Sequence, residues 1–141
     1  MVKKKVFVSF DYETDKHYKF LLQAWDSNPK FEFVFDDNSS QEVNSYNVGR
    51  IKAALTQKIT SATHTLVIIG KEANKKHKDY LLIQERNWIN WEIEKSNILG
   101  KKIVGIKLAK QFEPPENILN IGASWAFSFT EDTIIKALED A

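Results

Sequence analysis

The most constraining feature of the sequence is the apolar run Thr65-Leu66-Val67-Ile68-Ile69, which ends at Gly70. Successive side chains of a strand point to opposite faces of a sheet, so a run that is apolar at nearly every position needs cover on both faces. Central strands of parallel sheets have this character. The run therefore predicts a buried strand in an α/β sheet with helices on both sides.

Strand-like and helix-like segments alternate along the rest of the chain. Short β-branched and aromatic stretches predict further strands at 5–10, 31–35, 103–108 and 125–129. Helical spacing of apolar residues predicts helices at 15–25, 44–60, 85–99 and from 131 onward. This alternation calls for a single doubly wound open parallel sheet of five strands in the order 2-1-3-4-5, with helices on both faces.

Residues at the helix ends and on the first helix support these boundaries. Gly100 suits the position just after the third helix, and Thr130 suits the N-cap of the last one. The segment 111–122 contains two consecutive prolines and predicts a loop with at most a short helical turn. The apolar stripe of the first helix is predicted to be Tyr18, Leu21, Leu22 and Trp25.

Length and composition limit the classes of protein to which the chain can belong. Its 141 residues fit one domain, 1–141, and its 20 basic and 19 acidic side chains give no electrostatic reason to expect nucleic acid. Without cysteine, and with three scattered histidines, the sequence predicts neither disulfides nor a metal site. The lysines at 3–5 precede an apolar run too short for a signal peptide, so we expect a cytoplasmic protein with no membrane association.

The helix at 85–99 places one carboxylate on its core-facing side. At about 100° per residue, Glu92 lies inside the apolar stripe. The stripe itself consists of Trp88, Ile89, Ile93 and Leu99, and Lys95 lies at its margin. A carboxylate so placed costs free energy unless it is paired, and such groups are over-represented at active sites. Two interpretations remain open here: a functional Glu92, or a structural glutamate whose stem packs while its head reaches solvent.

The loops after the strands are the expected place for a ligand. In a sheet of this order, ligands bind beyond the carboxyl ends of strands 1 and 3. The glycines form neither a dinucleotide-binding G-x-G-x-x-G nor a P-loop, and Gly70 stands where a phospho-acceptor receiver domain needs an aspartate. The lysine-rich segment 71–80 is either an anion-binding loop or a solvated connection, and we favour the connection.

Four segments in order resemble the TIR-domain family. They are Val6-Phe7-Val8-Ser9-Phe10-Asp11-Tyr12, Phe33-Val34-Phe35-Asp36-Asp37, the run 65–70, and Trp88-x-x-x-Glu92-Ile93. They look like the first box, the second strand with its BB loop, the third strand, and the catalytic W-x-x-x-E helix of TIR domains. The chain is similar over nearly its whole length to bacterial TIR-like proteins of the Thoeris anti-phage defence, and the resemblance implies their flavodoxin-like fold.

The resemblance implies an enzyme that cleaves the nicotinamide–ribose bond of NAD. It would transfer the ADP-ribosyl group to water, to the molecule's own adenine or ribose, or to another acceptor, and we expect a cyclic signalling nucleotide derived from ADP-ribose. NAD would be the substrate, with no cofactor or metal. Glu92 would be catalytic, because its negative charge stabilises an oxocarbenium-like ribose. The implied substrate-binding residues are Ser9, Phe10, Asp11, Tyr12, Asp36, Asn38 and Trp88, with Asp37 in the same loop. Many active TIR domains carry a basic residue where this chain has Asp11, which leaves the binding of the NAD phosphates open.

The resemblance also implies partners. They are NAD, further copies of the chain in an oligomer or filament formed through the loop after strand 2, a phage-derived trigger, and a downstream effector that senses the product. Two other functions stay open: a non-catalytic TIR-like scaffold that acts by homotypic assembly, and a module that binds a nucleotide signal without breaking it. Glu92 separates them, because a scaffold has no need of a carboxylate on the core-facing stripe.

Overall fold

The strands form one sheet in the predicted order. The computed structural model describes residues 3–29, 31–36 and 46–141. Five parallel strands lie in the order β2-β1-β3-β4-β5. Their bounds are β1 Lys4–Ser9, β2 Phe33–Asp36, β3 His64–Ile69, β4 Lys102–Lys107 and β5 Ser124–Ala126. The predicted open parallel α/β sheet of flavodoxin-like order is confirmed.

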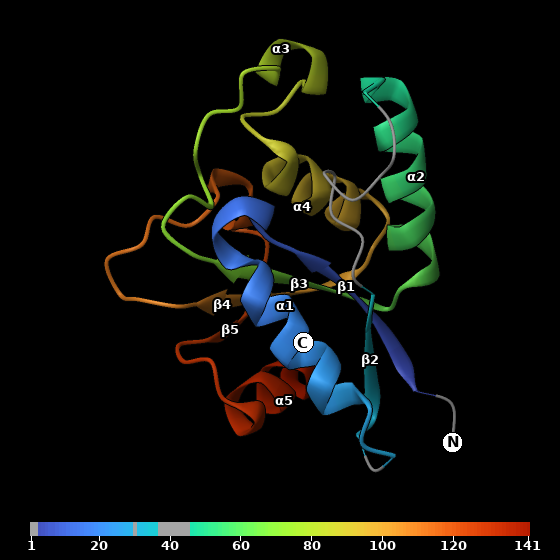
Figure 1. Ribbon diagram of the computed structural model, residues 1–141, viewed down its shortest axis with the longest axis vertical. Coiled ribbons are helices and arrows are strands. Elements are labelled where there is room, and N and C mark those ends of the chain that lie inside the picture. The colour runs from blue at the N-terminus through green and yellow to red at the C-terminus, as the bar shows by residue number, and fades with distance from the viewer. Residues whose placement is uncertain (1–2, 30, 37–45) are drawn as a thin grey trace.

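Helices cover both faces of this sheet. The helices are α1 Tyr12–Asp26, α2 Val48–Ser61, α3 Tyr80–Ile83, α4 Trp88–Ile98 and α5 Glu131–Asp140, with a 3-10 helix η1 at Glu116–Ile118. Figure 1 shows α1 and α5 on one side of the sheet and α2 with α4 on the other. The four-residue helix α3 was not predicted, whereas η1 is the expected short turn in the loop 111–122.

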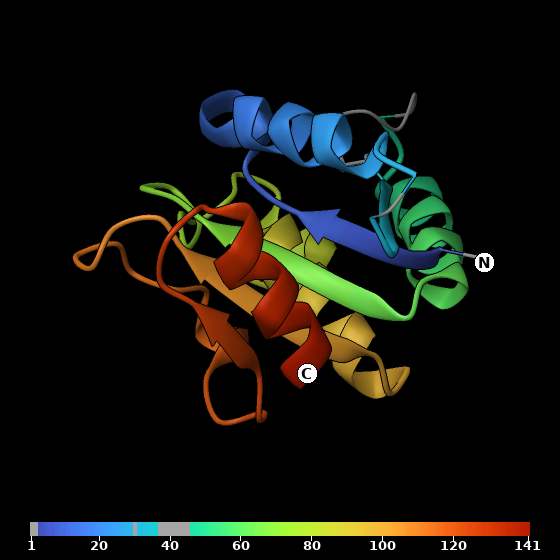
Figure 2. The same ribbon diagram turned by 90° about the horizontal axis from the view of Figure 1, so that it is seen from below.

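The central strand β3 is the buried core of the domain. All six of its residues are buried, as its apolar sequence predicts. Leu66 and Ile68 pack among residues of α1 and α5, while Val67 and Ile69 pack against α4. Figure 2 shows β3 between its neighbours β1 and β4. The polar Thr65 on this strand is satisfied, since its hydroxyl lies 2.7 Å from the Ser96 hydroxyl of α4.

Side-chain caps move three helix starts away from the predicted positions. The α2 helix begins at Val48 rather than 44, because the Asn47 side chain accepts a hydrogen bond from the Arg50 backbone N–H at 3.0 Å. The α4 helix begins at Trp88 rather than 85, because the Asn87 side chain accepts a hydrogen bond from the Asn90 backbone N–H at 2.9 Å. The α1 helix begins at Tyr12 rather than 15, because Asp11 caps it in the same way. The expected Thr130 cap is present, and Gly100 has the positive φ of 71° that suits its predicted place after a helix.

Two predicted core positions are wrong. Leu99 is 38% exposed, because α4 ends at Ile98 and the following residue leaves the helical stripe. Leu21 is 45% exposed, because the buried face of α1 is formed by Asp15, Lys19 and Leu22 instead. These three residues have the i, i+4, i+7 spacing of one helix face. The polar members of that face were overlooked when the stripe was assigned from apolar residues alone.

Candidate active site

Glu92 lies in the second turn of α4 and points into the protein. It is 2% exposed, and its Oε1 accepts a hydrogen bond from the Ser9 hydroxyl at 2.6 Å. Ser9 is the last residue of β1 and is itself fully buried. The interpretation in which the carboxyl group reaches solvent is therefore wrong. The helical spacing that placed Glu92 on the core-facing side is confirmed.

The surroundings of Glu92 favour its neutral form. Its second oxygen, Oε2, is buried and has no hydrogen-bond partner. Burial raises the pKa of Glu92 to about 8, and the hydrogen bond from Ser9 opposes this only in part. Lys95 does not approach the carboxyl group as a partner, since its ammonium lies over the Trp91 ring, 5.8 Å from the centroid. At neutral pH the carboxyl group is therefore mostly protonated in this conformation.

The structure brings Trp88 to the same side of the sheet as Glu92 and places Phe10 on the other. Trp88 opens α4, is 9% exposed, and packs in one cluster with Phe7 and Leu55. Phe10 is 4% exposed and belongs to the cluster between the sheet and α1. Trp88 therefore shares the α4 side of the sheet with the Glu92 carboxyl group, whereas Phe10 lies on the α1 side.

Asp11 and Tyr12 lie at the start of α1, where the predicted substrate turn was placed. Asp11 accepts hydrogen bonds from the Glu13 N–H and the Thr14 hydroxyl, each at 3.2 Å. The ammonium of Lys75, from the loop after β3, lies 4.0 Å from Asp11 Oδ2. A positive charge therefore stands beside Asp11 and comes from a different part of the chain.

The other predicted loop residues lie at or beyond the end of β2. Asp36 is the last residue of that strand, where its backbone pairs with Phe7 of β1. Asp37 and Asn38 lie outside the described residues. The role predicted for this loop in substrate binding stays a prediction.

Asparagine side chains tie the loop after β3 to α4 and η1. The residues that share this network are Asn74, Asn87, Asn90 and Asn117. Asn87 Nδ2 donates to the carbonyls of Ala73 and Lys75, each at 2.9 Å. Asn90 Oδ1 accepts from the Asn117 backbone N–H at 2.9 Å, and Asn90 Nδ2 donates to Asn74 Oδ1 at 3.1 Å.

This network changes how the segment 71–80 is understood. Ala73 is fully buried and Asn74 is 8% exposed, so the segment is not simply the solvated connection that its lysines suggested. The sequence did carry a signal for the network, because Asn87 and Asn90 are spaced i, i+3 on either side of Trp88 and so share a helix face.

Asp15 is a second buried carboxyl group that sequence reasoning missed. It is 5% exposed and its Oδ2 has no hydrogen-bond partner. Its carboxyl group lies against Gly70, where an added Cβ would come within 2.6 Å of the Asp15 Cγ. Burial, followed by the negative charge of Asp11, raises the pKa of Asp15 to about 6. The i, i+7 spacing of Asp15 and Leu22 would have revealed it.

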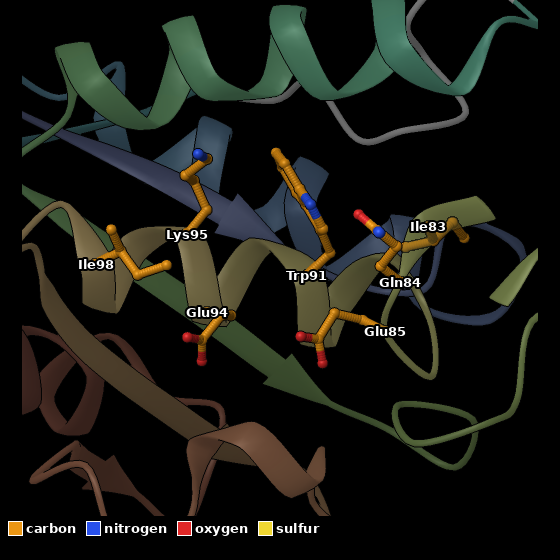
Figure 3. A pocket seen from close by; sticks show the side chains of 7 residues that line it. All are labelled: Ile83, Gln84, Glu85, Trp91, Glu94, Lys95 and Ile98. Carbon is orange, nitrogen blue, oxygen red and sulfur yellow. The ribbon is translucent and has the colours of Figure 1, made fainter. Parts of the chain in front are cut away.

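A shallow groove of about 180 Å³ lies beside α4 but is not lined by Glu92. Its lining residues are Ile83, Gln84, Glu85, Trp91, Glu94, Lys95 and Ile98. Figure 3 shows Trp91 and Lys95 directed toward α2, with Glu94 on another side of the helix. The groove therefore includes neither Glu92 nor its hydrogen-bond partner Ser9.

The described part of the chain lacks two further classes of feature. None of its helices is long and apolar enough to cross a membrane. Within residues 3–29, 31–36 and 46–141, no group of three or more His, Cys, Asp or Glu side chains is placed to hold a metal ion.

Comparison with solved structures gives likeness of fold. A 2-deoxyribosyltransferase from the psychrotolerant bacterium Bacillus psychrosaccharolyticus is 16% identical with a TM-score of 0.59, over 92% of this chain and 90% of that chain. The TIR domains of the activated Roq1 resistosome, which recognises the pathogen effector XopQ, are 17% identical with a TM-score of 0.48, over 75% of this chain and 59% of that chain. Identities this low show the fold alone.

Comparison with protein families is more specific. No curated protein matches the chain. The family model for the TIR-like domain of the Thoeris protein ThsB matches residues 7–112, which is 106 of the 141 residues. The matched range contains the last three residues of β1 with Ser9, the whole of β3 with Gly70 after it, and the whole of α4 with Trp88 and Glu92. The chain belongs to the family of TIR-like domains of the Thoeris protein ThsB.

Proposed function

We propose that this chain cleaves the nicotinamide–ribose bond of NAD, with Glu92 as its catalytic carboxylate. The observation that carries the proposal is the Glu92 carboxyl group, which is buried in α4 with one oxygen bonded to Ser9 and the other without a partner. A scaffold gains nothing from such a group, because burying an unpaired polar atom costs free energy. Membership of an anti-phage TIR family supports the same conclusion.

The chemistry needs one negative charge rather than an acid–base pair. Nicotinamide leaves as a neutral molecule from a cationic ring, so its departure requires little proton donation. The ribose becomes oxocarbenium-like as the bond breaks, and a carboxylate beside it stabilises that charge. Glu92 Oε2 is the free oxygen for this contact, while the Ser9 hydroxyl fixes the other.

The protonation of Glu92 fits this role when binding is considered. With a pKa of about 8 the free carboxyl group is mostly neutral at neutral pH. A cationic pyridinium ring placed beside it favours the ionised form, so NAD binding would release a proton from the protein. We therefore expect kcat/KM to rise with pH until Glu92 is ionised in the free protein, near pH 8.

The burial of Glu92 also means that the described conformation is a resting one. A carboxyl group that is 2% exposed cannot contact a substrate without movement of the residues around it. Assembly of several copies, or an infection-derived trigger, would supply that movement. We expect activity per molecule to rise with protein concentration or with the trigger, and a rate strictly proportional to concentration would argue for a self-sufficient monomer.

Membership of this family supports a proposal for the product and its use. The released ADP-ribosyl group would join to the molecule's own adenine or ribose, giving a cyclic nucleotide that a downstream effector senses. Transfer to water would give ADP-ribose instead. Mass analysis of the products after incubation with NAD separates the two outcomes.

The decisive experiment replaces Glu92 and a neighbouring glutamate in parallel. Glu92→Gln keeps the volume but removes the charge, so NAD cleavage should fall on the order of a hundredfold or more. Glu94→Gln, two residues on at a half-buried position, is the matched control and should leave the rate unchanged. Wild-type cleavage by Glu92→Gln would refute the catalytic assignment. No cleavage by the wild type under any assembly condition would leave the scaffold function in its place.

A specific observation favours the scaffold as the second candidate. Leu81, Leu82 and Ile98 are 76%, 65% and 66% exposed, and Ile98 lines the groove beside α4. Adjoining exposed apolar side chains, as Leu81 and Leu82 are on α3, commonly mark contacts with other proteins. Assembly without chemistry would explain this surface, but it leaves the buried carboxyl group of Glu92 without a purpose.

A further inference from the structure

A second carboxyl group, that of Asp15, is buried with one oxygen unpartnered, as Glu92 is, and the proposed reaction does not use it. Two buried side-chain atoms in the described part of the chain lack a hydrogen-bond partner: Glu92 Oε2 and Asp15 Oδ2. Asp15 is 5% exposed, so water reaches little of it. A buried polar atom without a partner calls for an explanation, and a missing ligand is one of the few available.

The fold holds Asp15 at the edge of the sheet where ligands bind. Asp15 lies in the first turn of α1, directly after β1, because Asp11 caps that helix. Its carboxyl group lies against Gly70, which follows β3, and the missing side chain of the glycine makes room for it. Since β1 and β3 are neighbours, Asp15 stands at the carboxyl ends of both strands. Ser9, the partner of Glu92, ends the same β1 strand.

A purely structural role does not account for this arrangement. An acidic residue in the first turn of a helix stabilises the helix from solvent, as the exposed Glu13 does. Asp15 is the second acidic residue of that turn, and its burial adds the cost of desolvation without a compensating hydrogen bond at Oδ2. An alanine at position 15 would occupy the same place beside Gly70 without that cost.

The charges around Asp15 indicate what kind of ligand atom it would contact. Asp11 and Glu72 add negative charge near it and, after burial, help to raise the pKa of Asp15 to about 6, while Thr14 and His17 act in the opposite direction. Three carboxyl groups in one place repel phosphate. The ammonium of Lys75 lies 4.0 Å from Asp11 Oδ2, so among the three carboxyl groups it offsets the charge of Asp11.

We propose that Asp15 is a substrate-binding residue that accepts a hydrogen bond from an uncharged donor of the nucleotide, either a sugar hydroxyl or an amide N–H. This inference rests on the proposed function only in that the nucleotide is the one on which Glu92 acts. The two carboxyl groups would then divide the work. Glu92 faces the reacting sugar carbon, and Asp15 holds a donor group from the α1 side of the sheet.

The first test follows the Asp15 carboxyl group directly in the wild-type chain. Carbon-13 NMR records its titration alone and with ADP-ribose, which carries sugar hydroxyls but no amide, or with nicotinamide mononucleotide, which carries both. Either probe should lower the midpoint of Asp15, because a donated hydrogen bond favours the ionised form. An effect of nicotinamide mononucleotide alone assigns the amide, and an equal effect of both probes assigns a hydroxyl. The signal of Glu13 should stay in place.

The second test uses Asp15→Asn, with Glu13→Gln as the matched control. Asn offers an amide in place of the carboxylate acceptor, so KM for NAD should rise by about tenfold or more while kcat changes much less. We expect KM of the wild type to change near pH 6, where Asp15 titrates, and the variant should lose this change. Glu13→Gln should leave both quantities unchanged.

The outcomes separate this inference from the proposed function. If a nucleotide moves the Asp15 midpoint but no NAD is cleaved, Asp15 binds as inferred and the enzymatic function fails. If neither probe moves that midpoint, or if Asp15→Asn keeps the wild-type KM and its pH dependence, the inference is overturned whatever Glu92 does. Inorganic phosphate that raises the midpoint would show an anion site and overturn the donor assignment. Should Asp15→Asn fail to fold, the wild-type titration decides.

Discussion

Glu92→Gln should make the protein more stable, and increasingly so as the pH rises. The ordinary pKa of 4.5 applies to the unfolded chain, whereas burial raises the pKa of Glu92 to about 8 in the folded protein. Between these values the folded state keeps a proton that the unfolded state has released. The wild type therefore loses stability as the pH rises through this window, and the loss is complete above the folded pKa.

The size of the effect follows from the two values. At about 1.4 kcal/mol for each factor of ten in the proton equilibrium, the window from 4.5 to about 8 corresponds to a ceiling on the order of 5 kcal/mol. By neutral pH, on the order of 3 kcal/mol of this has been lost. Water that enters around α4 when Glu92 ionises reduces this loss of stability in the alkaline part of the pH range. Glutamine at this position cannot ionise and carries none of it.

Urea denaturation at several values from roughly pH 5 to 8 measures this directly. The stability difference between Glu92→Gln and the wild type should be small at the acidic end and grow toward the alkaline end. Subtracting the two curves cancels contributions from other titrating groups, Asp15 and His64 among them. Glu94→Gln should run parallel to the wild type. A Glu92→Gln difference that is independent of pH would refute the burial argument, and a large loss of stability at every pH would make Glu92 structural.

Three further predictions test the packing around the site. Gly70→Ala should cost about 1–3 kcal/mol of unfolding free energy, because its Cβ would overlap the Asp15 carboxyl group, and in an Asp15→Ala background most of that cost should vanish in a double-mutant denaturation cycle. Asn90→Ala should cost about 2–3 kcal/mol of unfolding free energy in thermal denaturation, because Asn74 and Asn117 lose buried hydrogen-bond partners. Asn97→Ala, at an exposed position, is the control and should change little. Equal effects of the two substitutions would contradict the network. His64 is buried, and desolvation chiefly lowers its pKa, so its contribution to stability is present above pH 6.5 and is lost as the pH falls below that value. His64→Gln should remove this loss of stability at acidic pH. The same loss in the variant as in the wild type would contradict the prediction.

The sheet could be predicted from sequence because its signals are redundant. The run 65–69 is apolar on both alternations, and each strand is followed by a turn and a helical pattern. An error of one or two residues at any strand end leaves the order of the strands unchanged. The helix starts depended instead on single side chains, Asp11 and Asn87, whose caps moved α1 and α4 to new first residues. Such caps are local hydrogen bonds that apolar spacing does not register.

The candidate site was predicted in part for a related reason. The core-facing position of Glu92 could be predicted, because it is a charge inside an otherwise apolar helical stripe. Asp15 was missed because the stripe of its helix was drawn through apolar residues only, which selected the exposed Leu21 in place of the buried acid. The asparagine network joins residues up to 42 positions apart in the chain, and no local pattern specifies such contacts.

Accessibility is the property that helical spacing cannot supply, and it bears directly on mechanism. The spacing identifies Glu92 as core-facing, but only the structure shows that its carboxyl group is 2% exposed and closed to a substrate in this conformation. The same burial keeps the carboxyl group mostly protonated at neutral pH. A Glu92 that is closed to substrate therefore also lacks the charge that the proposed reaction needs. Exposure to NAD and ionisation are then coupled, because the opening that admits the cationic ring also removes the desolvation that opposes the charge. Under the proposed function, the resting protein is inactive for two linked reasons, and one rearrangement around α4 would remove both.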